Sequence, residues 1–299
     1  MELLYFKSKK GNFGDDLNPW LWPQLFDMKA KEKEAKFLGI GSILHNGNPD
    51  LIKYAQYKKI VFGTGIRPNK DYSKFAIDAT YDIRYLRGPQ SSKMLNDKYK
   101  YIADAAYCIR ILQDFDSKFC NTPKKYQLSL MPYFHSIEFF DWEKLCKSIG
   151  AHYISPLSEN GVEATLREIA QSQFLITEAM HGAILADILR VPWHRFVLST
   201  PYTEGARISE FKWTDWQESI YETNNEISYI EFYNNKISTS NLVNSLLKKK
   251  KVFIQMTNLQ KVEDSILDKL SKKINYSLSS DDTLKRIDSM LEEEINKFH

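Results

Sequence analysis

The chain has 299 residues, which is long enough for two medium-sized domains or one large one. Hydrophobic residues make up 43% and aromatic residues 13% of it, so the chain can build buried cores and is not disordered as a whole. Its 41 basic and 38 acidic residues nearly cancel, to a net charge of +3. This balance excludes a protein dedicated to nucleic acid, which would carry a strong basic excess.

Cysteine usage and apolar runs indicate the cellular compartment. Cys108, Cys120 and Cys146 are odd in number and too widely spaced for a local metal-binding pair, so we expect reduced thiols. The N-terminal stretch MELLYFKSKKGNFGDD lacks the long apolar region and small-residue cleavage site of a secretory signal. No stretch approaches the roughly 18 apolar residues of a transmembrane helix. We therefore expect a cytoplasmic protein, and a position at the inner face of the membrane is the alternative.

Short apolar runs alternate with helix-like stretches in residues 1–120, which we predict to form an N-terminal Rossmann-like domain. Continuous apolar strands separated by helices are typical of a mainly parallel sheet covered on both faces. The polar stretch 114–125, which contains Pro123, is the predicted junction to the next domain. The expected strands are 3–6, 36–44, 59–65, 83–88 and 101–109, and the expected helices are 16–26 and 89–95.

A second alternating series predicts a C-terminal Rossmann-like domain over residues 121–233. Two doubly wound α/β units in series resemble the GT-B architecture, in which ligands bind at the carboxyl ends of the strands. We therefore expect the functional site in a cleft between the two units. The expected strands are 126–134, 151–156, 174–178 and 193–199, and the expected helices are 139–150, 162–172 and 180–190.

From residue 234 the composition shifts to lysine, serine and asparagine, and we predict a helical C-terminal tail over 234–299. Helix-like pieces lie around 259–273 and 281–298. The second piece carries apolar residues at helical spacing, which predicts core packing or a subunit contact. This stripe consists of Leu284, Ile287, Leu291 and Ile295. The run Lys248–Lys251 is also compatible with peripheral attraction to an anionic membrane surface, where a lipid-linked acceptor would lie.

The stretch 174–193 has the strongest features of a catalytic site. An apolar strand ends at Thr177 or Glu178, and a helix is expected to begin within two residues, with His181 in its first turn. A helix N-terminus attracts anions, so this histidine would lie beside a bound phosphate or carboxylate. Glu178 could orient the imidazole or supply a second proton-transfer group. The alternative is a purely structural histidine.

A second candidate site lies in residues 83–95. Arg87 follows a strand, Gly88 makes the turn, and Pro89 suits the first helical position. The helix N-terminus and the Arg87 guanidinium would then both face a phosphate or carboxylate. Ser91 could add a hydroxyl donor. The alternative is a strand-end arginine in a surface ion pair.

The loop after the first strand carries acids and amides. Gly11 and Gly14 permit a tight loop, and Asp15, Asp16 and Asn18 surround an expected helix start. Two carboxylates would repel a pyrophosphate, which excludes a dinucleotide-binding loop. Acids and amides are instead usual partners of sugar hydroxyls, so Asn12, Asp15 and Asp16, together with His135 after a later strand, are predicted to bind an acceptor. Capping of the helix by one of the two aspartates is the alternative.

Further candidates follow other strands. His135 lies at the end of the first strand of the second domain, and Asp104 follows another strand, so either could line the cleft. The stretch 200–216 is interpreted as a polar, aromatic loop. Its Arg207 and Lys212 could fold over an anionic donor, or they could be solvated surface charges.

Taken together, these segments resemble the polysaccharide pyruvyltransferase family, and most closely its bacterial exopolysaccharide-modifying members. The matching motifs occur in order over residues 9–216, and the longest is FLITEAMHGAILADILRVPW. The others are GNFGDDLNP, FLGIGSIL, VFGTGIRP, YLRGPQSSKML, IADAAY, LMPYFHS and EFKWTDW.

The resemblance implies a GT-B-like fold and transfer of a pyruvyl group from phosphoenolpyruvate to a sugar, which forms a cyclic pyruvate ketal. By analogy, His181 would be the general acid/base and Arg87 would hold the donor. Some members carry an arginine two residues before this histidine, where this chain has Ala179. Arg207 or Lys212 would then substitute for that anion contact.

The chemistry needs a proton donor and cations on two anionic groups, so neither a metal nor a cofactor is expected. No HExxH motif or Cys/His cluster occurs in the sequence. The main alternative is a GT-B glycosyltransferase that uses a nucleotide-sugar donor. A non-catalytic carbohydrate-binding protein is a third possibility.

Overall fold

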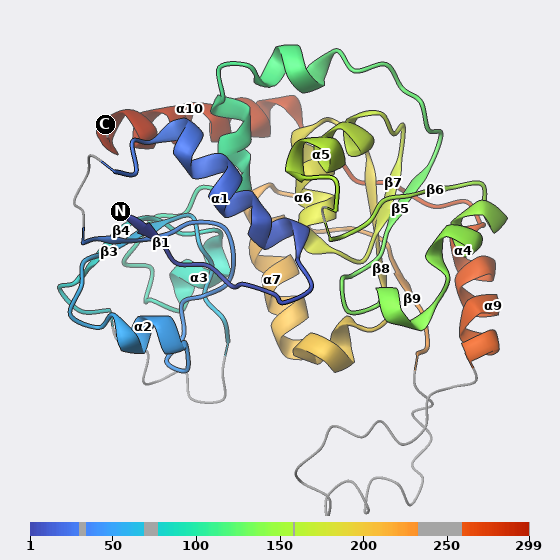
Figure 1. The fold of residues 1–299 in the computed structure, drawn as a ribbon, viewed down its shortest axis with the longest axis horizontal. Helices are drawn as coiled ribbons and strands as arrows, with labels where there is room; N and C mark the ends of the chain where they lie inside the picture. The colour runs from blue at the N-terminus through green and yellow to red at the C-terminus, as the bar shows by residue number, and fades with distance from the viewer. Residues whose placement is uncertain (30–33, 69–76, 158, 233–258, 299) are drawn as a thin grey trace, which may run out of the picture.

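The structure is a computed structural model that describes residues 1–29, 34–68, 77–157, 159–232 and 259–298. Its two parallel sheets occupy opposite ends of an elongated molecule, with helices packed around both (Figure 1). The predicted α/β class with parallel sheets is therefore confirmed. The stretch Lys248–Lys251 lies outside the described residues. Within the described part of the chain, no helix is long and apolar enough to cross a membrane.

The first sheet has four parallel strands in chain order. Its strands are β1 (Glu2–Leu3), β2 (Lys36–Leu38), β3 (Lys59–Phe62) and β4 (Tyr81–Tyr85). The connections carry α1 (Phe13–Leu25) and α2 (Pro49–Lys53), and α3 (Pro89–Lys93) follows β4. The strands are short, with two to five residues each. Gly39 lies against the Trp22 indole so closely that an added Cβ would meet Nε1 at 2.4 Å.

The second sheet has five parallel strands in the order β6-β5-β7-β8-β9. The chain runs from β5 outward to β6 and then back past β5 to β7, so the direction of strand addition reverses beside β5. Such a reversal opens a crevice at the carboxyl ends of the strands on either side. The strands are β5 (Ser129–Met131), β6 (His152–Tyr153), β7 (Leu175–Thr177), β8 (Trp193–Val197) and β9 (Ile227–Tyr229).

Helices cover this second sheet and connect it to the first. The α-helices are α4 (Trp142–Ser148), α5 (Val162–Ala170), α6 (Met180–Ile188) and α7 (Ala206–Ser219). Short helical turns are η2 (Ala105–Ile111), η3 (Asp116–Cys120), η4 (Ile137–Phe139) and η5 (Pro201–Gly205). One hydrophobic cluster runs through the molecule, since it includes Phe37 of β2, Leu175 of β7 and Ile184 of α6.

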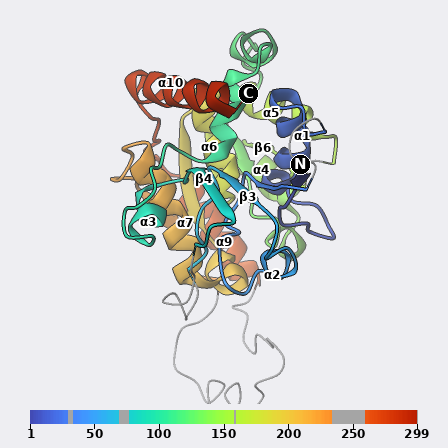
Figure 2. The same cartoon turned by 90° about the vertical axis from the view of Figure 1, so that its left-hand side faces the viewer.

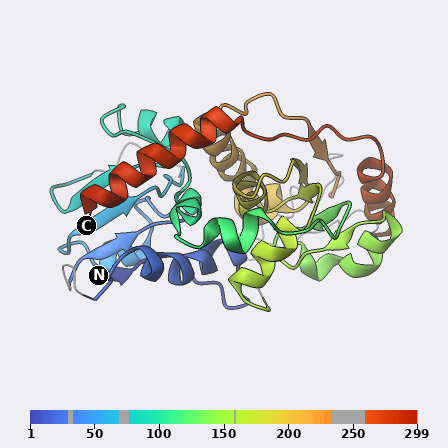
Figure 3. The ribbon, with the colours of Figure 1, turned by 90° about the horizontal axis from the view of Figure 1, so that it is seen from above.

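Two helices near the C-terminus return to the body of the protein. Helix α9 (Leu259–Leu270) packs beside α4, and α10 (Asp281–Phe298) packs against η2 and reaches the four-stranded sheet with its C-terminal end (Figures 2 and 3). The predicted stripe on α10 is confirmed as core packing, because all four of its residues are buried. Phe298 contacts the rings of Phe26, Phe37 and Phe62.

The prediction of a strand over 101–109 was wrong. Only Tyr101 forms an isolated bridge to Leu86, and the 3-10 helix Ala105–Ile111 follows. The Asp104 carboxylate accepts a hydrogen bond from the Ala106 amide at 3.0 Å and thereby caps this helix. Residues 102–109 are all buried, so the run has no periodicity that would distinguish a strand from a helix.

The prediction of a loop over 200–216 was also wrong. This stretch forms the turn η5 and most of α7, whose buried residues recur at helical spacing. Ser209, Trp213, Trp216 and Ile220 face the core. Pro201 and Gly205 make the region look like a loop, but they lie before α7 and do not interrupt it.

Candidate active site

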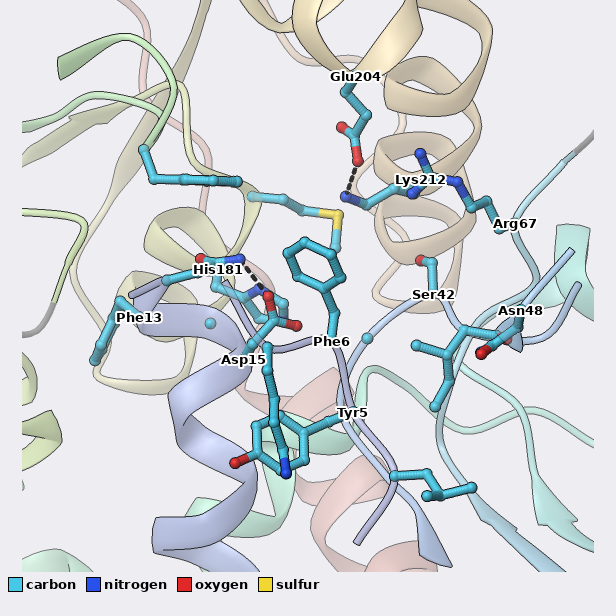
Figure 4. Close-up of a pocket in the computed structure, with 18 of the residues that line it drawn as sticks. Tyr5, Phe6, Phe13, Asp15, Ser42, Asn48, Arg67, His181, Glu204 and Lys212 are labelled. Atoms are coloured by element: carbon cyan, nitrogen blue, oxygen red, sulfur yellow. Dashed lines mark hydrogen bonds and ion pairs between the residues drawn. The ribbon is translucent and has the colours of Figure 1, made fainter. Parts of the chain in front are cut away.

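A cavity of 830 Å³ lies between the two halves of the molecule (Figure 4). One wall comes from the segments after β1 and β2, at the carboxyl edge of the first sheet. The opposite wall comes from the segments after β5 and β7, where the strand order reverses, and α7 adds a third side. Both parallel sheets therefore direct their carboxyl ends at this space, as the sequence predicts.

His181 lines the cavity from the second position of α6, and its side chain is 15% exposed. The ring lies directly against the backbone of Gly14, where an added Cβ would meet Nδ1 at 2.0 Å. On its other edge, Nε2 lies 3.8 Å from Asp104 Oδ1. This distance is too long for a hydrogen bond, and the two groups form an ion pair only when the imidazole is protonated. The imidazole is thus held between α1 and the start of η2.

Asp104 is the buried partner of His181. Burial alone would raise the pKa of its carboxyl group, but the facing His181 and the charge of Arg87 outweigh burial and lower the pKa. Its Oδ1 accepts from Ala106, and Oδ2 has no hydrogen-bond partner among the described residues. An ionised carboxylate at this place orients the histidine.

Asp15 lies beside His181 in the first turn of α1 and lines the same cavity. Burial raises the pKa of its carboxyl group to about 6, although the charges of His181 and Lys212 partly offset that rise. The Asn12 amide, which also lines the cavity, donates a hydrogen bond to it. Asp15 can therefore exchange a proton near neutral pH.

A cationic end of the cavity is formed by Arg67 and Lys212, which approach each other around Glu204 (Figure 4). Lys212 Nζ lies 2.7 Å from Glu204 Oε1. Burial would raise the pKa of Glu204, but the nearby charges of Lys212, Arg67 and Arg87 lower it below its ordinary value. Positive charge therefore dominates this end, which suits a small anion.

Sequence reasoning did not identify Arg67. Its signal was available, because Arg67 follows the glycine-rich strand end 63–65 by two positions. That places a basic side chain at the carboxyl edge of a parallel sheet, where anionic ligands bind. The motif VFGTGIRP, which contains Arg67, contributed only to the family resemblance.

The structure does not bring Arg87 to the cavity surface. Its side chain is fully buried, and Nε donates to Asp215 Oδ2 at 2.9 Å. Nη1 donates to Ser42 Oγ at 2.6 Å, and Ser42 forms the cavity wall. Ser91 donates to the same Asp215 carboxylate at 2.7 Å. Arg87 and Ser91 therefore bind Asp215 of α7 behind the cavity wall. Neither side chain lines the cavity, so Arg87 can act on a ligand there only through its positive charge.

Glu178 is likewise placed behind the cavity. Its carboxylate accepts hydrogen bonds from the backbone amides of Leu198, Ser199 and Thr200 at 3.1, 2.7 and 2.9 Å. Burial raises its pKa, while these bonds and one from Ser136 oppose the rise. This carboxylate anchors the segments after β5 and β8, so it does not reach the cavity as a proton-transfer group.

The remaining candidates divide by position. His135 is exposed and lines the cavity. Asp16 accepts from the backbone amide of Asn12 at 3.4 Å and lies outside the cavity lining. Arg207 is exposed in the first turn of α7 and also lies outside it, whereas Lys212 lies inside. Of the two predicted substitutes for the missing arginine, only Lys212 reaches the cavity.

Comparison with known proteins connects this site to a family. Residues 9–199 match the polysaccharide pyruvyl transferase family. The chain belongs to this family. It is 33% identical over 225 residues to the succinoglycan biosynthesis protein ExoV of Rhizobium meliloti (strain 1021). That match covers 74% of this chain and 65% of the length of ExoV.

A crystal structure of a functionally uncharacterised protein of Klebsiella pneumoniae also resembles the chain, at a TM-score of 0.42 and 16% identity. The similarity covers 68% of this chain and 86% of the other. The residues matched to the polysaccharide pyruvyl transferase family include Asp15, Arg67, Asp104 and His181. Lys212 lies beyond the matched residues.

Proposed function

We propose that this protein transfers a pyruvyl group from phosphoenolpyruvate to a sugar of a polysaccharide or its precursor, forming a pyruvate ketal. The observation that carries the proposal is the shared cavity, in which His181, backed by ionised Asp104, faces the cationic pair Arg67 and Lys212. The name of ExoV supports an exopolysaccharide as the acceptor. We also propose that the two sheets form GT-B-like domains over 1–120 and 121–233, with a tail over 234–299.

In this proposal the cationic end holds the donor. The planar Arg67 guanidinium binds two oxygens of the phosphate or carboxylate at once, and Lys212 supplies a point charge to the other group. Glu204 fixes the Lys212 ammonium by their 2.7 Å contact. The methylene carbon of the donor then faces His181.

The reaction begins when His181 protonates the donor's methylene carbon, which leaves an oxocarbenium-like centre at the neighbouring carbon. A sugar hydroxyl adds there and loses its proton to ionised Asp15. A second hydroxyl of the sugar then forms the second ketal bond, while the bond to the phosphate oxygen breaks and phosphate departs with the bonding electrons. Two hydroxyl protons are released, one replaces the proton used at carbon, and phosphate takes the other.

A product assay tests the proposed function directly. Purified protein is incubated with phosphoenolpyruvate and a panel of galactosides, glucosides and mannosides. We expect phosphate release together with a saccharide whose mass increases by pyruvate minus water. Thermal unfolding supplies a second readout, because a bound donor stabilises the folded state. Stabilisation by UDP or CMP sugars, without stabilisation by phosphoenolpyruvate, would favour the glycosyltransferase alternative.

Substituting Arg67 tests the donor end of the cavity. Charged hydrogen bonds contribute about 1.5–3 kcal/mol, so Arg67→Ala should raise the KM for phosphoenolpyruvate by roughly 10- to 100-fold. Arg67→Lys should recover part of the loss, since it restores the charge without the planar fork. Arg207→Ala is the matched control, because Arg207 lies outside the cavity lining. A larger donor KM in the Arg207 variant than in the Arg67 variant would contradict this assignment.

The raised pKa of Asp15 predicts that activity falls at low pH, which gives the pH profile an acidic limb. With a pKa of about 6, its carboxyl group is protonated below that pH and cannot accept the hydroxyl proton. We therefore expect kcat to fall as pH drops through about 6. Asp15→Asn should lower kcat by about 10²-fold and abolish that limb. Asp16→Asn, one residue along the same helix, should retain both activity and limb. An unchanged limb in the Asp15 variant would exclude Asp15 as its origin.

Asp15→Asn should stabilise the folded protein at high pH although it lowers activity. The folded-state pKa of Asp15 is raised from 3.8 to about 6, so its contribution is most favourable at low pH and is lost as pH rises through 6. At about 1.4 kcal/mol per unit, the cost at pH 8 approaches roughly 3 kcal/mol. Asp15→Asn should therefore raise the Tm at pH 8 but not at pH 4. A lower Tm at pH 8 would show that burial of this charge does not strain the fold.

A further inference from the structure

The cavity is larger than the donor requires. Its 830 Å³ falls within the range of roughly 300–1,000 Å³ that holds drug-sized ligands. Phosphoenolpyruvate is a three-carbon acid with a single phosphate, and the cationic end accommodates it. The remaining space is bordered by the segment after β1 and by the first turn of α2, both on the N-terminal side.

An aromatic ring stands in the middle of this space. Phe6 lines the cavity and is nevertheless 55% exposed. Figure 4 shows its ring between Asp15 and His181 on one side and Ser42 and Asn48 on the other. Isolated apolar residues are common on protein surfaces and need no explanation. Phe6 differs because it lines a polar cavity that His181 also lines.

Polar groups surround the Phe6 ring, but their charges are mixed and do not form an anion-binding site. The Asp50 carboxylate lines the same part of the cavity. The Asn48 side chain fixes the segment that carries Asp50, since it accepts from the Asp50 amide at 3.0 Å and donates to Ile43 O at 2.8 Å. Glu2 and Lys53 also border this part, so its charges are mixed. An aromatic face beside a carboxylate matches a neutral sugar ring, which has an apolar face and hydroxyl donors.

We propose that Phe6 is the stacking platform of an acceptor subsite, on which one neutral sugar ring of the glycan packs while Asp50 accepts hydrogen bonds from its hydroxyl groups. This inference rests on the proposed function. It identifies the N-terminal wall as the acceptor side and the end with Arg67 and Lys212 as the donor side. A sugar held on Phe6 presents its neighbouring hydroxyls toward Asp15 and His181, where the ketal forms.

Three variants test the platform. Phe6→Ala removes the ring, Phe6→Trp keeps an aromatic face, and Ile52→Ala is the matched control. Ile52 is 64% exposed on α2, two positions after Asp50, and it does not line the cavity. We expect Phe6→Ala to raise the acceptor KM roughly tenfold, equivalent to about 1.4 kcal/mol. Phe6→Trp and Ile52→Ala should stay within about threefold of the parent protein, by the same scale.

The donor side must remain intact in Phe6→Ala. We expect the KM for phosphoenolpyruvate and the donor-induced shift in Tm to be unchanged. An unchanged acceptor KM would overturn the proposal, and so would an equal rise in both KM values, since that would indicate general damage to the cavity.

Calorimetric titration with an oligosaccharide acceptor, without donor, separates this inference from the proposed function. If the parent protein neither binds phosphoenolpyruvate nor releases phosphate, the proposed function fails. Saccharide binding that weakens in Phe6→Ala would still support the subsite. The absence of saccharide binding to the parent protein across the panel, or equal binding by Phe6→Ala, would overturn it.

Discussion

His181→Ala should lose pyruvyl transfer by roughly 10²- to 10⁴-fold while remaining folded, because general acid catalysis contributes a factor of that size. The reacting carbon needs a proton from a fixed donor. Among the cavity-lining residues, His181 is the imidazole held between the Gly14 backbone and the Asp104 carboxylate. Phosphate release from phosphoenolpyruvate in the presence of acceptor measures this loss.

Two further variants separate chemistry from folding. His181→Ala leaves Asp104 without its partner, and a buried unpaired carboxylate destabilises the protein. His181→Gln retains a donor toward Asp104 and should keep the Tm closer to that of the parent, yet it should be equally inactive. His152→Ala is the matched control, since His152 stacks on Tyr126 outside the cavity lining. Near-normal turnover in His181→Gln would contradict the assignment of His181 as the acid.

Asp104→Asn should reduce kcat by about 10²-fold with little change in the KM for phosphoenolpyruvate. Asp104 acts through His181 and is therefore a positioning residue. Its ionised carboxylate lies 3.8 Å from His181 Nε2 and orients the ring, so removing the charge should affect turnover and not donor binding. Asparagine keeps an oxygen for the Ala106 amide but removes the charge, so η2 should remain capped.

The split between kcat and KM identifies this role. Asp104 orients His181 and lies outside the cavity lining that includes Arg67 and Lys212, so kcat should fall in Asp104→Asn while the KM for phosphoenolpyruvate stays near that of the parent protein. Asp288→Asn is the control, because the carboxylate of Asp288 on α10 pairs with Arg110 of η2 and not with His181. A kcat loss accompanied by an equal loss of donor binding and a lower Tm would indicate a structural role for Asp104 alone.

The position of the candidate site was largely predictable from the sequence. The strand-to-helix pattern predicts His181 in the first turn of a helix, and α6 begins at Met180. The acids after the first strand indicate Asp15, which lines the cavity. Both side chains reach one cavity because the carboxyl ends of parallel strands gather at one edge, while their chemical roles stay predictions.

The partners of charged residues were not predictable in this way. Arg87 and Asp215 are 128 positions apart, and their pairing depends on how α3 packs against α7. The stretch that forms α7 was interpreted as a loop, so the partner of Arg87 was not recognised. Periodicity predicts which face of an element is buried, but it does not predict which buried charges meet. Phe6 was missed for a related reason, since it was assigned to a strand that ends at Leu3.

A crystal structure of His181→Gln with bound phosphoenolpyruvate would test the central claim most directly, because this variant should retain the donor without consuming it. We predict that the phosphate and carboxylate lie between Arg67 and Lys212, and that the methylene carbon faces residue 181. A donor bound outside this cavity, or bound within it with the methylene carbon facing away from residue 181, would contradict the account.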